Sequence, residues 1–316
     1  MVSLKNRIVV LQMDPLDEVD IDGDTSFDLA LEAYNRGATI WTYQPDDLIF
    51  LNGRVSAFAR RVTRLERIKG NHVSFDAPVL LDLHTVDVIL VRQDPPFNMA
   101  YLTAAQLLER VQPGVLVLND PQGIRDAPEK LFVTDFQDLT PPTLITLNIQ
   151  AVQDFRSDHG DIVLKPLYGN GGAGVFLVRH DDGNFNTIVE QFIEHYQEPM
   201  IAQKFLKDVS AGDKRIILID GEPVGAINRV PAPGETRSNM HVGGKAEAID
   251  LTDRDKEICS RIGPALKSRG LVLTGIDVIG SWLTEINVTS PTGVQEVRRF
   301  GGADISALFW DWVEHQ

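Results

Sequence analysis

The sequence has a single cysteine, no excess of basic residues and no long apolar run, and each scarcity excludes a class of protein. Cys259 is the only cysteine in 316 residues, so an internal disulfide and a cysteine-based zinc site are both excluded. Acidic residues outnumber basic ones by 45 to 30, a formal charge of −15, which argues against a nucleic acid or an anionic membrane as partner. No stretch approaches the roughly 18 apolar residues of a membrane-spanning helix. We therefore expect a soluble, cytoplasmic protein of two or three domains.

Several catalytic signatures are also missing. The chain has no G-x-x-x-x-G-K-[ST] phosphate loop and no G-x-S-x-G motif, which excludes P-loop enzymes and serine hydrolases of the usual type. Its seven histidines show no H-E-x-x-H or comparable metal-ligand spacing. We interpret Cys259 as a buried helix residue without a reactive role.

The most informative segment that is present runs from residue 162 to 174 and reads IVLKPLYGNGGAG. Its glycines match the G-x-G-x-x-G dinucleotide fingerprint, which requires a helix to begin inside the glycines. Here they lead instead into the β-branched and aromatic segment 175–178, which has no helical period. The pattern therefore predicts strand, glycine loop, strand, with Lys165 at the base of a loop that covers nucleotide phosphates. A surface hairpin rich in turn residues and a dinucleotide-dependent oxidoreductase are the alternatives.

The first third of the chain alternates strand and helix patterns. Continuous apolar runs joined by helical segments predict a parallel sheet, whose ligands bind at the carboxyl ends of its strands. The expected strands are 8–11, 39–43, 86–91 and 115–118, and the expected helices lie near 25–37, where Thr25 and Ser26 supply the cap, and 100–110.

Paired prolines at 141 and 142 mark a boundary after which the pattern becomes antiparallel. Asp220-Gly221 is a strong hairpin turn signal between strands at 215–219 and 223–228. Thr252, with Asp255 three residues later, predicts the capped start of a long helix that ends at Gly270. We predict three domains, at 1–125, 126–205 and 206–316.

A cluster of oxygen ligands is predicted near the C-terminus. Segments 276–279 and 283–288 are expected to form paired strands, which places Glu285 and Asn287 on one face and brings Asp277 to the same side. Two carboxylates and a carboxamide oxygen suit Mg²⁺ that also holds substrate phosphates. The alternative is the polar outer face of a half-exposed sheet.

Scattered cations complete the pattern. Lys130, Arg215, Arg229 and Arg237 are each ordinary as surface residues, but beside a phosphate loop and a metal cluster they suggest a site for anions. Arg237 belongs to the segment 231–245, which has five Pro or Gly residues and almost no aliphatic side chains. A loop of that length inside a compact domain is usually functional or disordered.

The ordered set of motifs resembles the prokaryotic glutathione synthetases of the ATP-grasp superfamily over nearly the whole chain. The segment TEINVTSPTG at 284–293 is the most specific of them. The others are MDP at 13–15, RQDPPF at 92–97, NDP at 119–121, EKLF at 129–132, LKPLYGNGGAG at 164–174, GDKR at 212–215, DGEPVGAINRVP at 220–231 and GETRSN at 234–239.

The resemblance implies a fold class and a reaction. The fold would be α/β, with an N-terminal parallel-sheet domain followed by a two-part ATP-grasp fold of mainly antiparallel sheets. The enzyme would use ATP and Mg²⁺, with Mn²⁺ as an alternative cation, to join γ-glutamylcysteine to glycine through an acyl phosphate, as a cytoplasmic homotetramer. Another ATP-grasp carboxylate–amine ligase is the nearest alternative, and a non-catalytic nucleotide-binding protein is a more distant one.

The resemblance also implies roles for individual residues. Asp277, Glu285 and Asn287 would bind the metal. Arg92, Arg229, Ser290 and Thr292 would bind the peptide substrate. Arg215, Arg229, Arg237 and Asn239 would act in catalysis, the last two from a lid at 231–245. ATP would be bound by Lys130, Lys165, Gly169, Asn170, Gly171, Gly172, Ala173, Gln203, Lys204, Phe205, Leu206 and Asp213. Where this sequence has Gln295 the family often carries arginine, which affects the expected contacts to a substrate carboxylate.

Overall fold

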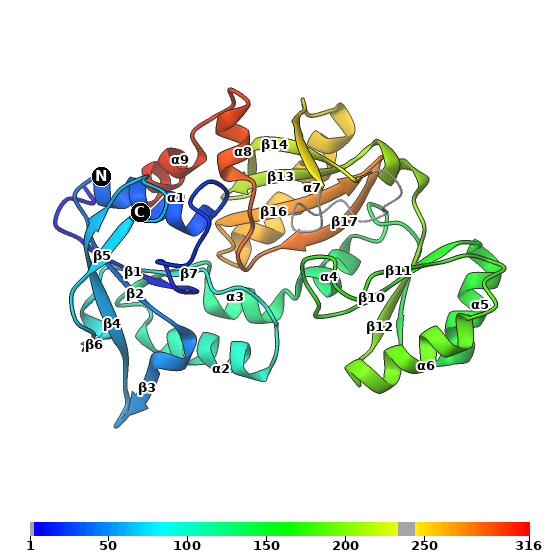
Figure 1. Ribbon diagram of the computed structural model, residues 1–316, viewed down its shortest axis with the longest axis horizontal. Coiled ribbons are helices and arrows are strands. Elements are labelled where there is room, and N and C mark those ends of the chain that lie inside the picture. The colour runs from blue at the N-terminus through cyan, green and yellow to red at the C-terminus, as the bar shows by residue number, and fades with distance from the viewer. Residues whose placement is uncertain (1–2, 233–243) are drawn as a thin grey trace.

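Three β-sheets follow one another along the chain in a computed structural model that describes residues 3–232 and 244–316 (Figure 1). Arg237 and Asn239 lie outside the described residues, as does most of the predicted lid. Within the described residues, no helix is long and apolar enough to cross a membrane.

The first sheet has the predicted parallel centre. Strands β1 (Ile8–Gln12), β2 (Thr39–Tyr43), β7 (Val88–Val91) and β8 (Leu116–Leu118) lie in the order β2-β1-β7-β8 and pair in parallel. The chain crosses between them through α1 (Thr25–Asn35) and α2 (Met99–Leu108), and α3 (Pro121–Asp126) follows β8. Their apolar runs are buried on both faces, as expected for a covered parallel sheet. The predicted cap of α1 was wrong by one residue, because the carboxylate of Asp24 accepts the hydrogen bond from the Phe27 amide.

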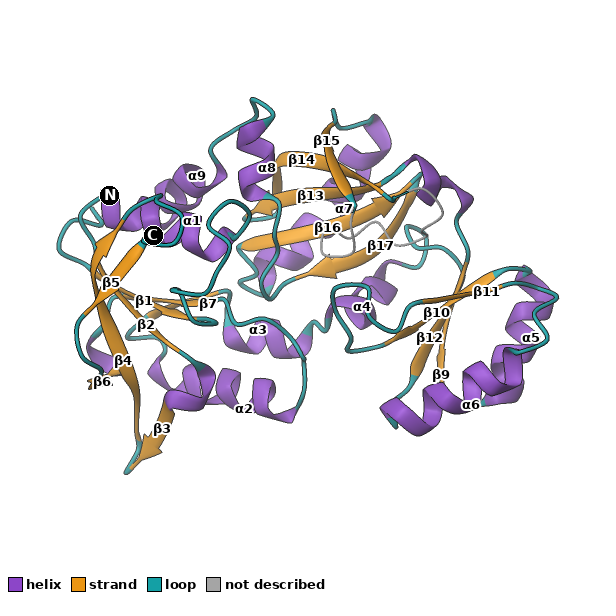
Figure 2. Cartoon of the chain, in the orientation of Figure 1, coloured by secondary structure: helices purple, strands orange, loops and turns teal. Residues whose placement is uncertain are grey.

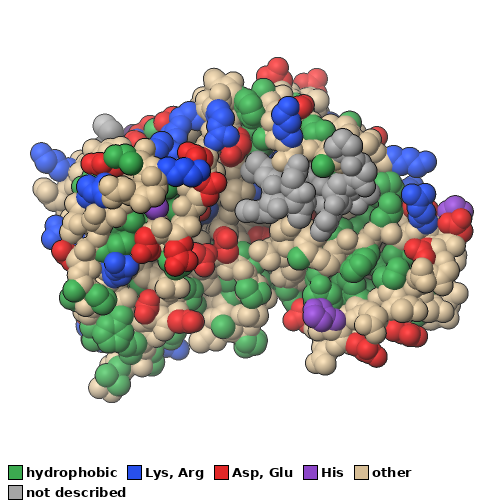
Figure 3. Space-filling model, in the orientation of Figure 1, with side chains coloured by type: hydrophobic (Ala, Val, Ile, Leu, Met, Phe, Trp, Pro, Cys, Tyr) green, Lys and Arg blue, Asp and Glu red, His purple; other side chains and the backbone are tan. Residues whose placement is uncertain are grey.

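An antiparallel extension of this sheet was not predicted. Residues 48–82 form β3 (Leu48–Leu51), β4 (Arg54–Leu65), β5 (Val73–Phe75) and β6 (Val79–Asp82), and β4 joins the extension to β2. Hydrophobic side chains gather on the surface of this extension (Figure 3). The exposed large ones are Phe50, Leu51, Phe58, Ile68, Val79 and Leu80.

The second sheet is small and has a core of its own. Strands β9 (Thr143–Thr146), β10 (Ile162–Pro166), β11 (Phe176–Val178) and β12 (Met200–Lys204) form an antiparallel sheet in the order β11-β10-β12-β9. Helices α5 (Ile149–His159) and α6 (Phe185–Tyr196) cover one face of it (Figure 2). Phe185, Val189 and Phe192 of α6 pack with buried residues of the strands in a cluster separate from the rest of the protein.

The third sheet is antiparallel, in the order β15-β14-β13-β16-β17. Its members are β13 (Asp213–Ile219), β14 (Glu222–Val230), β15 (Lys245–Ala248), β16 (Leu273–Ile279) and β17 (Trp282–Asn287). The predicted hairpin is confirmed, with Asp220 and Gly221 at positive φ angles of 48° and 73°. The predicted capping box is also confirmed, since Thr252 and Asp255 cap α7 (Asp253–Ser268).

The C-terminal helices return to the first sheet. After α8 (Val294–Arg299), helix α9 (Ile305–Glu314) packs beside α1, so the first and last parts of the chain share one hydrophobic core (Figure 1). The indole of Trp310 is fully buried there and donates to the Leu29 carbonyl at 2.8 Å. Each sheet falls in one of the three predicted segments, and the domain boundaries themselves stay predictions.

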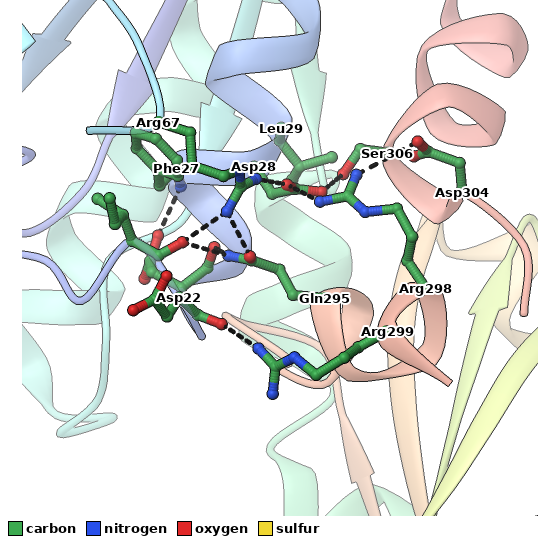
Figure 4. A network of polar contacts seen from close by, with 12 residues as sticks. Asp22, Phe27, Asp28, Leu29, Arg67, Gln295, Arg298, Arg299, Asp304 and Ser306 are labelled. Atoms are coloured by element: carbon green, nitrogen blue, oxygen red, sulfur yellow. Dashed lines mark hydrogen bonds and ion pairs between the residues drawn. The ribbon is translucent and has the colours of Figure 1, made fainter. Parts of the chain in front are cut away.

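A polar network, called here the junction cluster, links α1 to α8 and α9 around the buried carboxylate of Asp28 (Figure 4). One carboxylate oxygen accepts a hydrogen bond from Arg67 and another from Arg298, and the bond from Arg298 is 2.6 Å long. The other oxygen accepts from the Ser306 hydroxyl at 2.6 Å. Asp28 is therefore saturated by partners from three separate segments of the chain.

Candidate active site

A cavity lies between the second and third sheets, under the glycine-rich loop. All twelve residues predicted to bind ATP line it, together with Asp277 and Glu285. Apolar side chains for which no role was predicted also line it: Val163, Val175, Leu177, Val209 and Ile279. We call it the nucleotide cavity.

The glycine loop is a hairpin connection and contains no helix. Strands β10 and β11 pair antiparallel on either side of it, with Ile162 opposite Val178, so the dinucleotide fingerprint reading is excluded. Gly171 and Gly172 have φ angles of 62° and 79°, which residues with a Cβ rarely adopt. The Lys130 ammonium donates to the carbonyl of Gly169, which ties α4 (Glu129–Phe132) to the loop.

Two lysines converge on one carboxylate inside the cavity. The ammonium nitrogens of Lys165 and Lys130 lie 3.4 and 3.8 Å from Glu285 Oε1. Burial lowers the pKa of Lys165, because water no longer solvates its charge. Burial alone would raise the pKa of Glu285, but the two lysines outweigh it and hold that pKa below its usual value.

A second charged group lies on the adjoining strands. Arg215 Nε donates to Asp277 Oδ1 at 2.5 Å, and Arg229 Nη2 lies 3.0 Å from Asp277 Oδ2 and 2.5 Å from Asp213 Oδ2. All four side chains are buried. The two arginines overcome the effect of burial and keep the pKa of Asp277 well below its usual range. With Lys130, Lys165 and Glu285 these residues form what we call the cavity cluster.

The predicted metal ligands are adjacent and chemically suited to a hard cation. Asp277 faces Glu285 across β16 and β17, and Asn287 follows two residues later on the same face. No group of three His, Cys, Asp or Glu side chains in the described residues could hold a metal, so the set depends on the carboxamide oxygen of Asn287. Its amide nitrogen is buried without a hydrogen-bond partner among those residues, which leaves the amide free to turn its oxygen to a cation.

A second cavity adjoins the first and shares Asn170, Gly171 and Glu285 with it. It is lined on one side by Arg215, Arg229 and Asn287 and on the other by residues 289–292, including Ser290 and Thr292. We call it the acceptor cavity. Its position puts three of the four predicted peptide-binding residues, Arg229, Ser290 and Thr292, next to the predicted metal ligands.

Arg92 lies behind the 289–292 segment, outside the lining of both cavities. Its buried guanidinium donates to Ser26 Oγ at 3.0 Å and to the carbonyls of Pro291 and Thr289 at 3.1 and 3.5 Å. In this structure Arg92 therefore supports the backbone of the segment that carries Ser290 and Thr292.

Gln295 also lies away from both cavities. Its amide donates to the carbonyls of Ile21 and Asp24 at 3.1 and 2.6 Å, and its oxygen accepts from Arg67 at 2.7 Å (Figure 4). These hydrogen bonds belong to the junction between α1 and α8. They give no support to the expectation that Gln295 affects binding of a substrate carboxylate.

The sequence matches two family descriptions in succession. Residues 8–125 match the N-terminal domain of prokaryotic glutathione synthetase, and residues 129–302 match its ATP-grasp domain. The chain belongs to the prokaryotic glutathione synthetase family. It is 58% identical over 308 residues to the glutathione synthetase of Brucella melitensis, covering 97% of this chain and 98% of that one. The enzyme of Agrobacterium fabrum is 54% identical over 314 residues, with 99% and 98% covered.

Solved structures agree on the fold. A D-cycloserine synthetase superposes with a TM-score of 0.70 at 15% identity, covering 98% of this chain and 99% of that one. A D-alanyl-alanine synthetase A from Vibrio cholerae gives a TM-score of 0.63 at 14% identity, with 97% of each chain covered. The predicted fold class and family are confirmed, and the chain is an ATP-grasp ligase of the glutathione synthetase type.

Proposed function

We propose that the nucleotide cavity binds ATP with Mg²⁺ and that the acceptor cavity is where γ-glutamylcysteine is activated and joined to glycine. The observation that supports this most directly is that the two cavities adjoin and share Glu285. A nucleotide in the first would place its terminal phosphate next to a carboxylate held in the second. The Brucella melitensis relative is a glutathione synthetase, in agreement with this reaction.

The cavity cluster supplies the charges that the first step needs. Lys130 and Lys165 would leave Glu285 for the phosphate oxygens, because their contacts to that carboxylate are long. Asp277, Glu285 and Asn287 would hold Mg²⁺, which supplies Lewis-acid stabilisation of the phosphate charge. Arg215 would stabilise the transferred phosphoryl group, and Arg229 would hold the carboxylate of the peptide in line with it.

The second step needs exclusion of water as well as charge. An acyl phosphate hydrolyses in open solvent, so the glycine loop and a lid must cover it. Arg237 and Asn239 remain predicted lid residues. Ser290 and Thr292, held in place from behind by Arg92, would orient the peptide.

The deciding experiment measures phosphate release from the purified protein with Mg-ATP and γ-glutamylcysteine, with and without glycine, and confirms the product by mass. We expect release that depends on glycine and yields the tripeptide. Phosphate release that does not depend on glycine but depends on another amine would assign a different acceptor substrate and favour another carboxylate–amine ligase. Absence of ATP turnover with any acceptor would reduce the cavities to a binding site.

The metal assignment predicts the behaviour of Glu285→Gln. Removing one carboxylate should raise the Mg²⁺ concentration for half-maximal turnover by about tenfold or more, because the neutral amide is a weaker ligand. The measurement is a Mg²⁺ titration of turnover at saturating ATP. Glu247→Gln on β15 removes an exposed carboxylate of the same sheet and serves as the control. An unchanged titration in Glu285→Gln would remove Glu285 from the metal site.

A further inference from the structure

The carboxylate of Glu129 lines the acceptor cavity and has no role in the scheme above. Glu129 is the first residue of α4, which packs against β17, and its side chain contacts Thr289 and is part of the lining of the acceptor cavity. It comes directly before Lys130, which faces the nucleotide cavity. Glu129 therefore stands at the point where the two cavities adjoin.

Glu129 differs from the other acidic side chains there. Among the described residues, the carboxylates that line the acceptor cavity are those of Asp94, Glu129 and Glu285. Glu285 is engaged by two lysines, and Asp94 is exposed to solvent. Glu129 makes no ion pair within the described residues, and its one side-chain hydrogen bond there comes from the Thr289 hydroxyl at 2.9 Å.

The surroundings of Glu129 suit proton transfer. The bond from Thr289 fixes one carboxylate oxygen, and Thr289 is itself buried and held through its carbonyl by Arg92. The second oxygen remains for a substrate. A half-buried carboxylate that lines the cavity and is not neutralised by an ion pair within the described residues can accept a proton from a bound substrate.

We propose that Glu129 is the general base that deprotonates the ammonium of the incoming glycine, an inference that rests on the proposed function. At neutral pH glycine carries an ammonium group without a lone pair, so it cannot attack until a proton leaves. That proton passes to the free oxygen of Glu129. The nitrogen then forms its bond to the acyl carbon, and the bond from that carbon to the phosphate oxygen breaks with its electron pair on the phosphate. The second nitrogen-bound proton leaves with the phosphate.

The test compares two acceptors in the variant Glu129→Gln. The amide keeps the shape of the side chain and an oxygen to accept from Thr289, but it cannot take a proton. Turnover with glycine should fall by about 10²- to 10³-fold in kcat. Hydroxylamine is uncharged at neutral pH and needs no base before it attacks, so formation of the hydroxamate from the acyl phosphate should be nearly unchanged.

A pH profile gives a second measure. Raising the pH increases the fraction of glycine with a free amine, so the glycine rate of Glu129→Gln should rise with pH more steeply than that of the wild type. A purely structural role for Glu129 predicts equal losses with glycine and hydroxylamine and parallel pH profiles, and that result would overturn the proposal. Glu129→Asp serves as a second variant if the glutamine protein does not fold.

The matched control is Asp94→Asn, which removes the exposed carboxylate of the same cavity. We expect it to treat glycine and hydroxylamine alike. If Asp94→Asn instead loses glycine turnover selectively while Glu129→Gln does not, Asp94 is the base and the proposal fails. If the wild type forms the hydroxamate but no glycine peptide, the glycine assignment of the proposed function fails, which is distinguishable from an error about Glu129.

Discussion

The cavity cluster and the junction cluster both pair carboxylates with basic side chains, but the two lysines of the cavity cluster are only loosely paired. In the junction cluster the buried carboxylate of Asp28 accepts from Arg67, Arg298 and Ser306 (Figure 4). In the cavity cluster Lys165 reaches Glu285 at 3.4 Å, and both side chains line open space. A carboxylate with all its hydrogen bonds made holds secondary-structure elements together, whereas a loosely paired cation beside a cavity can change partners and bind a ligand. The comparison predicts that one cluster controls activity and the other stability.

Lys165→Ala should break the cavity cluster with the largest effect on function. Loss of a buried cation from the phosphate site is expected to lower kcat/KM for ATP by about 10²- to 10³-fold. The thermal midpoint should fall less than in Asp28→Asn, because burial already disfavours the charged form of Lys165. In addition, Glu285 retains Lys130 as an ion-pair partner. The measurements are ATP kinetics and thermal unfolding, with Lys256→Ala on the exposed face of α7 as control. Equal ATP affinity in Lys165→Ala would refute the role of this lysine.

Asp28→Asn should produce the opposite pattern. Removing the charge leaves Arg67 and Arg298 without their shared partner. This should lower the free energy of unfolding by about 2 kcal/mol, a value that allows for the partial exposure of both arginines. We expect a thermal midpoint roughly 4 °C or more below that of the wild type. At temperatures well below that midpoint, kcat should be near normal. Asp311→Asn, which removes an exposed partner of Arg36, is the control and should lie within about 0.5 kcal/mol of the wild type. Lost activity in a fully folded Asp28→Asn protein would show that the two clusters are coupled.

The two clusters also mark how far the sequence could predict the fold. Local patterns were enough for β1, β7, the 220–221 turn and the capping box of α7, because each depends on neighbouring residues. The extension that includes β4 was missed although its sequence alternates between buried and exposed residues. Its pairing with β2 joins segments distant in sequence. Such pairing is decided by packing, which periodicity does not report.

The site divides in the same way. The glycine loop and the strand that carries Glu285 could be predicted because a motif or a two-residue period places their side chains. The position of Arg92 behind the acceptor cavity could not, because its partners Ser26 and Pro291 come from segments 66 and 199 residues away. The role of Glu129 could not be predicted either, because its bond to Thr289 spans 160 residues. Within EKLF, its place next to Lys130 was the one available signal.

Cys259 sharpens the comparison, because it is a buried ionisable group that has no counter-charge among the residues that the structure describes. It lies in α7, as predicted, and burial together with the nearby Asp255 raises the pKa of its thiol to about 12. The folded state therefore holds the thiol proton more tightly than the unfolded chain, whose ordinary value is 9.0. The thiol therefore contributes to the free energy of unfolding at pH values below its unfolded pKa. As the pH rises from the unfolded pKa towards the folded pKa, this contribution is lost at about 1.4 kcal/mol per pH unit. Thermal midpoints of the wild type and Cys259→Ala should accordingly converge as the pH rises above 9.0, and a constant difference would contradict the assignment.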